Sequence, residues 1–172
     1  YTAAVVDLGT SVLVIRGDGY AEFFDCSVTP CAGETDTRIR LTSDAAGYML
    51  VDQHDTVEHY GVAGELLSIT DIRGNTQALA YDAAGRLEGI DSSTGDYITF
   101  GHDGSGRVAS MTDQAGRVWG YRYDAAGNLE YVDNPDGTLR RYHYNESQYV
   151  GASLPHALTG ITDERGNRYA IY

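Results

Sequence analysis

The chain has 172 residues, which is long enough for one domain with a sizeable hydrophobic core. Its formal net charge of −13 excludes nucleic acid and anionic lipid as expected partners, because phosphate groups repel an acidic surface. No apolar stretch approaches the roughly 20 residues that a transmembrane helix needs, so we expect no membrane insertion. The sequence begins at Tyr1 rather than at a methionine, and we expect it to be part of a longer product.

Residues 1–60 are predicted to form an irregular β-hairpin region. The apolar run Ser11–Ile15 has the length of a strand, and Ser43–Gly47 has the composition of a tight turn. Arg16–Asp18 spell Arg-Gly-Asp, a tripeptide that integrins bind, but the surrounding glycines favour an ordinary hairpin turn. We therefore assign no binding role to this tripeptide.

Cys26 and Cys31 are the two cysteines of the chain. One pair is too few for a structural zinc site, which needs four ligands. A local disulfide is plausible if the protein is exported, and two ordinary thiols are the equal alternative. The spacing alone leaves both possibilities open.

Glycines recur every 21 residues through the middle of the chain, in two interleaved series. Each glycine closes a short polar segment that often opens with aspartate. An aspartate side chain can accept a hydrogen bond from the backbone two residues on, and glycine adopts positive φ without a Cβ clash. We therefore predict a tight turn at every member of the two series, namely Gly64, Gly85, Gly106 and Gly127, and Gly74, Gly95, Gly116 and Gly137.

About six residues separate successive turns, which is the length of one strand and too short for a stable helix. Strands joined by such turns must be antiparallel, so we predict an all-β meander of about 16 short strands. The two glycine series should lie at opposite margins of the sheet. Four strands are predicted at Thr76–Tyr81, Tyr97–His102, Val118–Tyr123 and Leu139–Tyr144.

Side chains on these four strands form columns at the same 21-residue spacing. One column contains Leu79, Phe100, Tyr121 and Tyr142, and a second contains Tyr81, His102, Tyr123 and Tyr144. The intervening strands place apolar residues three apart, as in Leu87 and Ile90, which does not fit simple alternation. Either each of these strands contains a β-bulge, or both of its faces are partly covered.

The spacing is interrupted after Tyr144 and resumes near Thr159. We predict an insertion loop over about residues 145–157 within a repeat region that spans residues 61–172. Residues 1–60, with looser strands and turns of the same kind, would precede this repeat region.

The motif Y-D-x-x-G-R/N-L, at Tyr81–Leu87 and Tyr123–Leu129, resembles the tyrosine–aspartate (YD) repeats of the Rhs family of bacterial proteins. The paired residues Tyr81-Asp82 and Tyr123-Asp124 carry this resemblance, and His102 departs from it. The resemblance implies a curved sheet that forms part of a larger hollow shell, as in teneurin-like proteins. It also implies that the shell encloses or delivers a C-terminal toxin domain, which this chain lacks.

The implied partners are the remaining repeats of the same polypeptide and the enclosed toxin domain. The implied location is outside the cell or at its surface, with delivery by a contact-dependent secretion system as one route. A surface adhesin that binds carbohydrate or protein through its aromatic faces is the alternative.

We predict no catalytic residue, no cofactor and no metal site. His54 and His59 are five residues apart and would point to opposite faces of a strand. Ser105 lies in a predicted turn, without the partnered base that a serine nucleophile requires.

Overall fold

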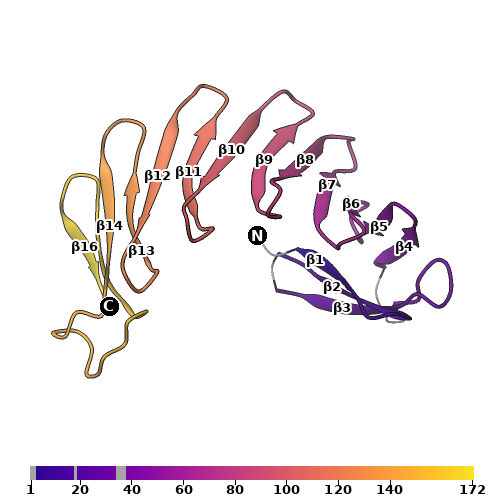
Figure 1. Ribbon diagram of the computed structural model, residues 1–172, viewed down its shortest axis with the longest axis horizontal. Helices are drawn as coiled ribbons and strands as arrows, with labels where there is room; N and C mark the ends of the chain where they lie inside the picture. Colours follow the sequence, from indigo (N-terminus) through magenta and orange to yellow (C-terminus); the bar gives the residue numbers. More distant parts are fainter. Residues whose placement is uncertain (1–2, 18, 34–37) are drawn as a thin grey trace. The chain divides into compact units, whose positions relative to one another are not determined.

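The computed structural model describes residues 3–17, 19–33 and 38–172, and within them it contains sixteen β-strands and no helix (Figure 1). Accordingly, no helix of the described residues is long and apolar enough to cross a membrane. The predicted antiparallel meander of about 16 strands is confirmed. The chain forms two compact units, Tyr1–Asp96 and Tyr97–Tyr172, which are described separately below.

The first unit begins with a three-stranded antiparallel sheet. It consists of β1 (Ala4–Asp7), β2 (Ser11–Ile15) and β3 (Ala21–Asp25), in the order β1-β2-β3. Strands β4 to β16 belong to a thirteen-stranded sheet whose strand order is the sequence order. The first unit contributes β4 (Arg40–Asp44), β5 (Gly47–Val51), β6 (Val57–Tyr60), β7 (Leu66–Thr70), β8 (Thr76–Tyr81) and β9 (Leu87–Ser92).

The second unit is a run of antiparallel hairpins. Its first five strands are β10 (Tyr97–His102), β11 (Val108–Asp113), β12 (Val118–Tyr123), β13 (Leu129–Asp133) and β14 (Leu139–Tyr144). It ends with β15 (Leu158–Thr162) and β16 (Arg168–Ile171). The four predicted strand ranges coincide with β8, β10, β12 and β14.

A buried hydrophobic cluster lies in the first unit, where the three-stranded sheet packs against β4–β7. Val12, Val14 and Phe24 come from the small sheet, and Leu41, Leu50, Tyr60 and Leu66 come from the large one. Burial of each of these side chains contributes about 1.5–3 kcal/mol. The cluster therefore fixes the first three strands to the start of the repeat region.

Glu58 carries a carboxylate into this cluster and is 5% exposed. Arg16 donates a 2.6 Å hydrogen bond to Glu58 Oε1, and the Tyr60 hydroxyl donates one of 2.6 Å to Oε2. A buried carboxylate needs such partners, since an unpaired one costs several kcal/mol. The arginine of the Arg-Gly-Asp tripeptide is therefore a half-buried partner of Glu58, while Asp18 lies outside the described residues.

The three-residue apolar spacing is explained by a β-bulge in the odd-numbered strands of the repeats. Leu79 pairs with Ile90, but Tyr81 pairs with Leu87, so Glu88 is the extra residue. The same register shift occurs between β6 and β7, β10 and β11, β12 and β13, and β14 and β15. Of the two alternatives that the sequence left open, the structure has the bulge.

The insertion between β14 and β15 is held at its two ends. Asn145 has a positive φ of 51° and donates its backbone N–H to the carbonyl of Ala157. Its side-chain oxygen accepts a 2.7 Å bond from the N–H of Leu154. The expected loop therefore lies where the 21-residue spacing breaks. A division of the chain near residue 60 stays a prediction, and the two compact units separate between β9 and β10.

Candidate functional site

The YD turn after β8 is closed by backbone hydrogen bonds across its Asp-x-x-Gly segment. The N–H of Gly85 donates to the carbonyl of Asp82 at 2.9 Å, and the N–H of Asp82 donates to the carbonyl of Arg86 at 2.9 Å. Gly85 has a φ of 75°, a conformation that costs other residues about 1–2 kcal/mol. Glycine is required at this point for conformational reasons.

The Asp82 carboxylate ties the same turn together through its side chain. Oδ1 accepts backbone N–H groups from Ala84 and Arg86, each at 2.9 Å. Oδ2 accepts from Arg86 Nε at 2.8 Å and forms an ion pair with Arg86 Nη2 at 2.7 Å. The Arg86 backbone N–H and then its guanidinium lower the pKa of Asp82 from 3.8 to about 2. We call this aspartate–partner pair, four residues apart, the turn contact.

The turn contact recurs at both margins of the sheet. Arginine is the side-chain partner in Asp103–Arg107 and Asp113–Arg117, and asparagine is the partner in Asp71–Asn75 and Asp124–Asn128. Hydrogen bonds lower the pKa of each of these aspartates. Either arginine or asparagine can occupy this position because both carry an N–H group that reaches Oδ2. Sequence reasoning identified the aspartates and glycines but missed these partners.

The YD tyrosines connect neighbouring strands through their hydroxyl groups. Tyr81 donates a 2.8 Å hydrogen bond to the carbonyl of Leu66, and Tyr123 donates one of 2.8 Å to the carbonyl of Val108. Each acceptor lies fifteen residues earlier, at the start of the preceding strand. Burial raises the pKa of Tyr81 and of Tyr123, so both remain protonated donors at neutral pH. Phenylalanine would fill the same space without satisfying the carbonyl.

Arg107 joins two repeats of the second unit. It forms the turn contact with Asp103, and its guanidinium also lies 4.3 Å from the centre of the Tyr123 ring. A cation over an aromatic ring contributes about 0.5–1 kcal/mol at an exposed site. His102, which replaces a YD tyrosine, pairs with Val108 in the same register.

The predicted columns share a face with the aliphatic residues of the bulged strands. Phe100 pairs with Met111, and Tyr121 pairs with Val132. All four side chains are half-buried. The side chains on this face of the second unit are thus more exposed to solvent than those of the hydrophobic cluster in the first unit.

All eight predicted turn glycines have positive φ, between 74° and 97°. At Gly64 a Cβ would also collide with the carbonyl oxygen of Val5, whose N–H donates to the Gly64 carbonyl at 2.9 Å. This turn has a second role because it contacts β1 as well as reversing the chain. At Gly85 a Cβ would meet nothing within 4 Å, so backbone conformation alone selects glycine there.

A disulfide joins Cys26 and Cys31 immediately after β3. The backbones of Asp25 and Ala32 pair across this small loop. Ser105, considered above as a nucleophile, donates its backbone N–H to Asp103 as part of a turn. His54 likewise donates its backbone N–H to Asp52.

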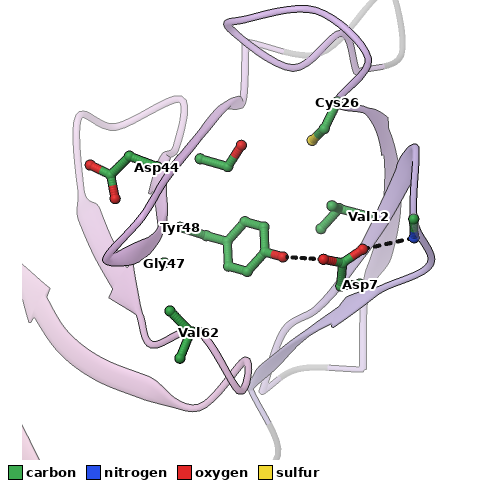
Figure 2. Close-up of a pocket in the computed structure, with 9 residues that line it drawn as sticks. Asp7, Val12, Cys26, Asp44, Gly47, Tyr48 and Val62 are labelled. Atoms are coloured by element: carbon green, nitrogen blue, oxygen red, sulfur yellow. Dashed lines mark hydrogen bonds between the residues drawn. The ribbon is translucent and has the colours of Figure 1, made fainter.

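A cavity of about 350 Å³ lies between the small sheet and the β4–β5 hairpin of the first unit. Figure 2 shows Tyr48 reaching across it toward Asp7, to which its hydroxyl donates a 2.9 Å hydrogen bond. Asp7 also accepts the N–H of Gly9 at 2.7 Å, and this bond lowers the pKa of Asp7. Asp44 and Val62 line the opposite side (Figure 2). Within the described part of the chain, no three His, Cys, Asp or Glu side chains are grouped to hold a metal ion.

Comparison with solved structures gave chains of low identity. The crystal structure of TcdB2-TccC3-Cdc42 is 17% identical, with a TM-score of 0.48 over 94% of this chain and 9% of that one. The Photorhabdus luminescens Tc holotoxin pore carrying TccC3-D651A is 18% identical, with a TM-score of 0.46 over 84% of this chain and 9% of that one. The crystal structure of TcdB2-TccC3 without its hypervariable C-terminal region is 17% identical, with a TM-score of 0.47 and coverages of 94% and 9%. The chain thus spans about a tenth of the length of these proteins.

A comparison with curated proteins gave no match. The family model described as RHS Repeat matches residues 62–97 and 102–139. These stretches contain the YD turns at Gly85 and Gly127 and the tyrosine hydrogen bonds described above. Residues 62–97 and 102–139 therefore match RHS repeats.

Proposed function

We propose that this chain is a wall segment of an RHS shell that encloses or delivers a C-terminal toxin domain lying outside these 172 residues. Residues 61–172 would form the repeating wall and residues 1–60 its start. The eight turn glycines and the Tyr81-Asp82 and Tyr123-Asp124 pairs would be structural repeat positions. The role requires no catalysis, and the protein would act outside the bacterial cell or at its surface.

The proposal rests on one observation: the repeat hairpins form their hydrogen bonds within their own turns and with the neighbouring strand. Turn contacts such as Asp103–Arg107 order their ends, and Tyr123 satisfies a carbonyl of a neighbouring strand. The buried hydrophobic cluster, by contrast, consists of residues between Val5 and Leu66 and so lies outside most of the repeats. A sheet whose repeats contact mainly their neighbours can extend one hairpin at a time and border an interior without filling it.

Tyrosine suits the interior face of such a wall. Its ring provides packing area against aliphatic residues on the neighbouring strand, and its hydroxyl tolerates water or a polar partner. Pairs such as Tyr121 with Val132 would contribute about 0.2–1 kcal/mol each. Summed over many repeats, such pairs can stabilise a wall that lacks a dense centre.

The experiment uses the complete gene product and the same product lacking the repeats. Both are treated with chymotrypsin, and the survival of the C-terminal domain is followed by mass spectrometry. Enclosure predicts that the domain survives only when the repeats are present. Equal cleavage of the domain in both proteins would contradict enclosure.

Carbohydrate binding is a second candidate, favoured by the cavity of Figure 2. It combines the Tyr48 ring with the carboxylates of Asp7 and Asp44, and such groups accept hydrogen bonds from sugar hydroxyls. A glycan array probed with this chain and with Tyr48→Ala tests it. A signal that the substitution removes would support an adhesin, and equal signals from both proteins would remove the cavity from consideration.

A further inference from the structure

Both faces of the small sheet of the first unit carry apolar side chains, and the inner face also carries the buried Glu22. Its inner face contributes Val12, Val14 and Phe24 to the buried cluster, and each is at most 2% exposed. The apolar side chains of the opposite face are Ala4, Val6, Leu13, Ile15, Ala21 and Phe23, which we define as the outer face, and the Ser11–Asp25 pair lies at its border. Val6 is 38% exposed and Phe23 is 58% exposed.

Strand register places the outer face in two continuous rows. Val6 pairs with Leu13, which pairs with Phe23, so the three side chains lie side by side across β1, β2 and β3. Ala4, Ile15 and Ala21 form the parallel row in the same way. Single exposed apolar residues are ordinary, but an uninterrupted apolar face marks an interaction surface. Strands that are apolar on both faces are typical of sheets covered on both sides.

Each margin of the small sheet has a backbone partner along part of its length. On the β1 side, Ala4 pairs with Glu65 and Val5 donates its N–H to Gly64. On the β3 side, Asp25 pairs with Ala32. The exposed apolar rows lie on the outer face, so a partner would pack there through side chains, as one sheet packs on another.

Charge defines the chemistry of that partner. Residues 1–96 contain sixteen acidic residues and five arginines, a net charge of −11. A second copy of the chain would bring the same negative charge and be repelled, whereas a basic chain would be attracted. Asp25 follows Phe23 on the same side of β3 and places a carboxylate at the border of the apolar rows.

We propose that the outer face of the β1–β3 sheet binds a basic polypeptide segment in extended form, with apolar side chains alternating with lysine or arginine. Every second side chain of such a segment would cover the Val6–Leu13–Phe23 row. The intervening cations would point away from the sheet, and their long side chains would bend back to Asp25 and the acidic surface at its border. This proposal is independent of enclosure, because it concerns the surface opposite to the buried cluster.

The test measures binding of a synthetic peptide of alternating lysine and valine to the whole 172-residue chain by fluorescence anisotropy. The matched probe alternates glutamate and valine. We expect the basic peptide to bind and the acidic peptide not to bind. Phe23→Ser should weaken the basic peptide at least about tenfold, since the area that Phe23 contributes is lost.

The control variant is Ile72→Ser, which removes an apolar side chain that is 71% exposed at a repeat turn. It should bind the basic peptide like the unaltered chain. If Phe23→Ser lowers the unfolding temperature, Val6→Ser replaces it, because the two side chains belong to one row. Equal binding by the unaltered chain, Phe23→Ser and Val6→Ser would overturn the proposal. So would equal binding of the acidic peptide, or a dimer in analytical ultracentrifugation that Phe23→Ser abolishes.

Discussion

The hydroxyl of Tyr123 donates a 2.8 Å hydrogen bond to the backbone carbonyl of Val108, fifteen residues earlier and at the start of the preceding bulged strand. Tyr81 makes the same bond to Leu66. The regular pairing of β11 with β12 runs from Ser110 to Thr112, so Val108 lies beyond it. The YD tyrosine satisfies a carbonyl at the point where regular pairing between the two strands stops.

Tyr123→Phe should therefore lower stability by about 1 kcal/mol, because the Val108 carbonyl loses its partner in a half-buried position. Thermal and urea unfolding measure the change. Tyr97→Phe is the control, since Tyr97 is 45% exposed and lies on the other face of β10 from Phe100. Equal stability of Tyr123→Phe and the unaltered chain would show that the hydroxyl is dispensable.

The turn glycines should differ in their response to alanine. Gly85→Ala forces a side chain into positive φ and should cost about 1–2 kcal/mol. Gly64→Ala should cost more, because its Cβ would also collide with Val5. Gly104→Ala is the matched control, with open space around its Cβ and no positive φ. Urea unfolding of the three variants gives the order, and a loss for Gly104→Ala as large as that for Gly85→Ala would contradict the assignment of backbone strain.

Acid should weaken the turns over a defined pH window. The pKa of Asp82 is about 2 in the folded chain, below the value of 3.8 expected when it is unfolded. Because the folded pKa is the lower one, the stabilisation is complete above about pH 4 and is lost as the pH falls through 2. Unfolding temperatures measured from pH 5 to pH 2 should fall less steeply for Asp82→Asn than for the unaltered chain. Identical slopes would show that the Asp82 carboxylate does not stabilise the fold.

The insertion loop should depend on one ion pair. Both Glu146 oxygens accept from Arg168, and Thr159 donates to Oε2 at 2.7 Å, which together lower the pKa of Glu146 to about 2. Glu146→Gln removes the charge, so chymotrypsin should cleave faster after Tyr149 within the loop. Glu88→Gln, at an exposed bulge position, should leave the cleavage rate unchanged. Cleavage at the same rate in both variants would refute the anchoring role of Glu146.

The repeat strands could be predicted from sequence because glycine spacing defines where each strand ends. Positive φ restricts the turn to glycine, and the six residues between turns leave room only for a strand. The ranges of β8 and β10 followed directly from Gly74 and Gly95. The three-residue spacing of Leu87 and Ile90 left two arrangements open for β9, namely a β-bulge or a strand that is partly covered on both faces. Both arrangements fit the same spacing of apolar residues. Only the strand register in the structure distinguishes them.

Other features gave no periodic signal. Phe24 and Leu41 both belong to the buried cluster, although no repeat spacing relates them. The turn contact of Asp82 with Arg86 could have been found, since an arginine or asparagine stands four residues after the aspartate in several turns. The Tyr123 hydrogen bond could not, because it depends on where pairing between two strands stops.

The most direct measurement of the central claim is amide hydrogen exchange of the repeat turns in the second unit. The N–H groups of Gly106 and Gly127 donate to the carbonyls of Asp103 and Asp124 at 2.9 and 3.0 Å. If the hairpins are held by their own turns and tyrosines, both amides should be protected together with the strands beside them. Exchange of both glycine amides at the rate of an unstructured peptide, while Leu50 in the buried cluster stays protected, would contradict the account.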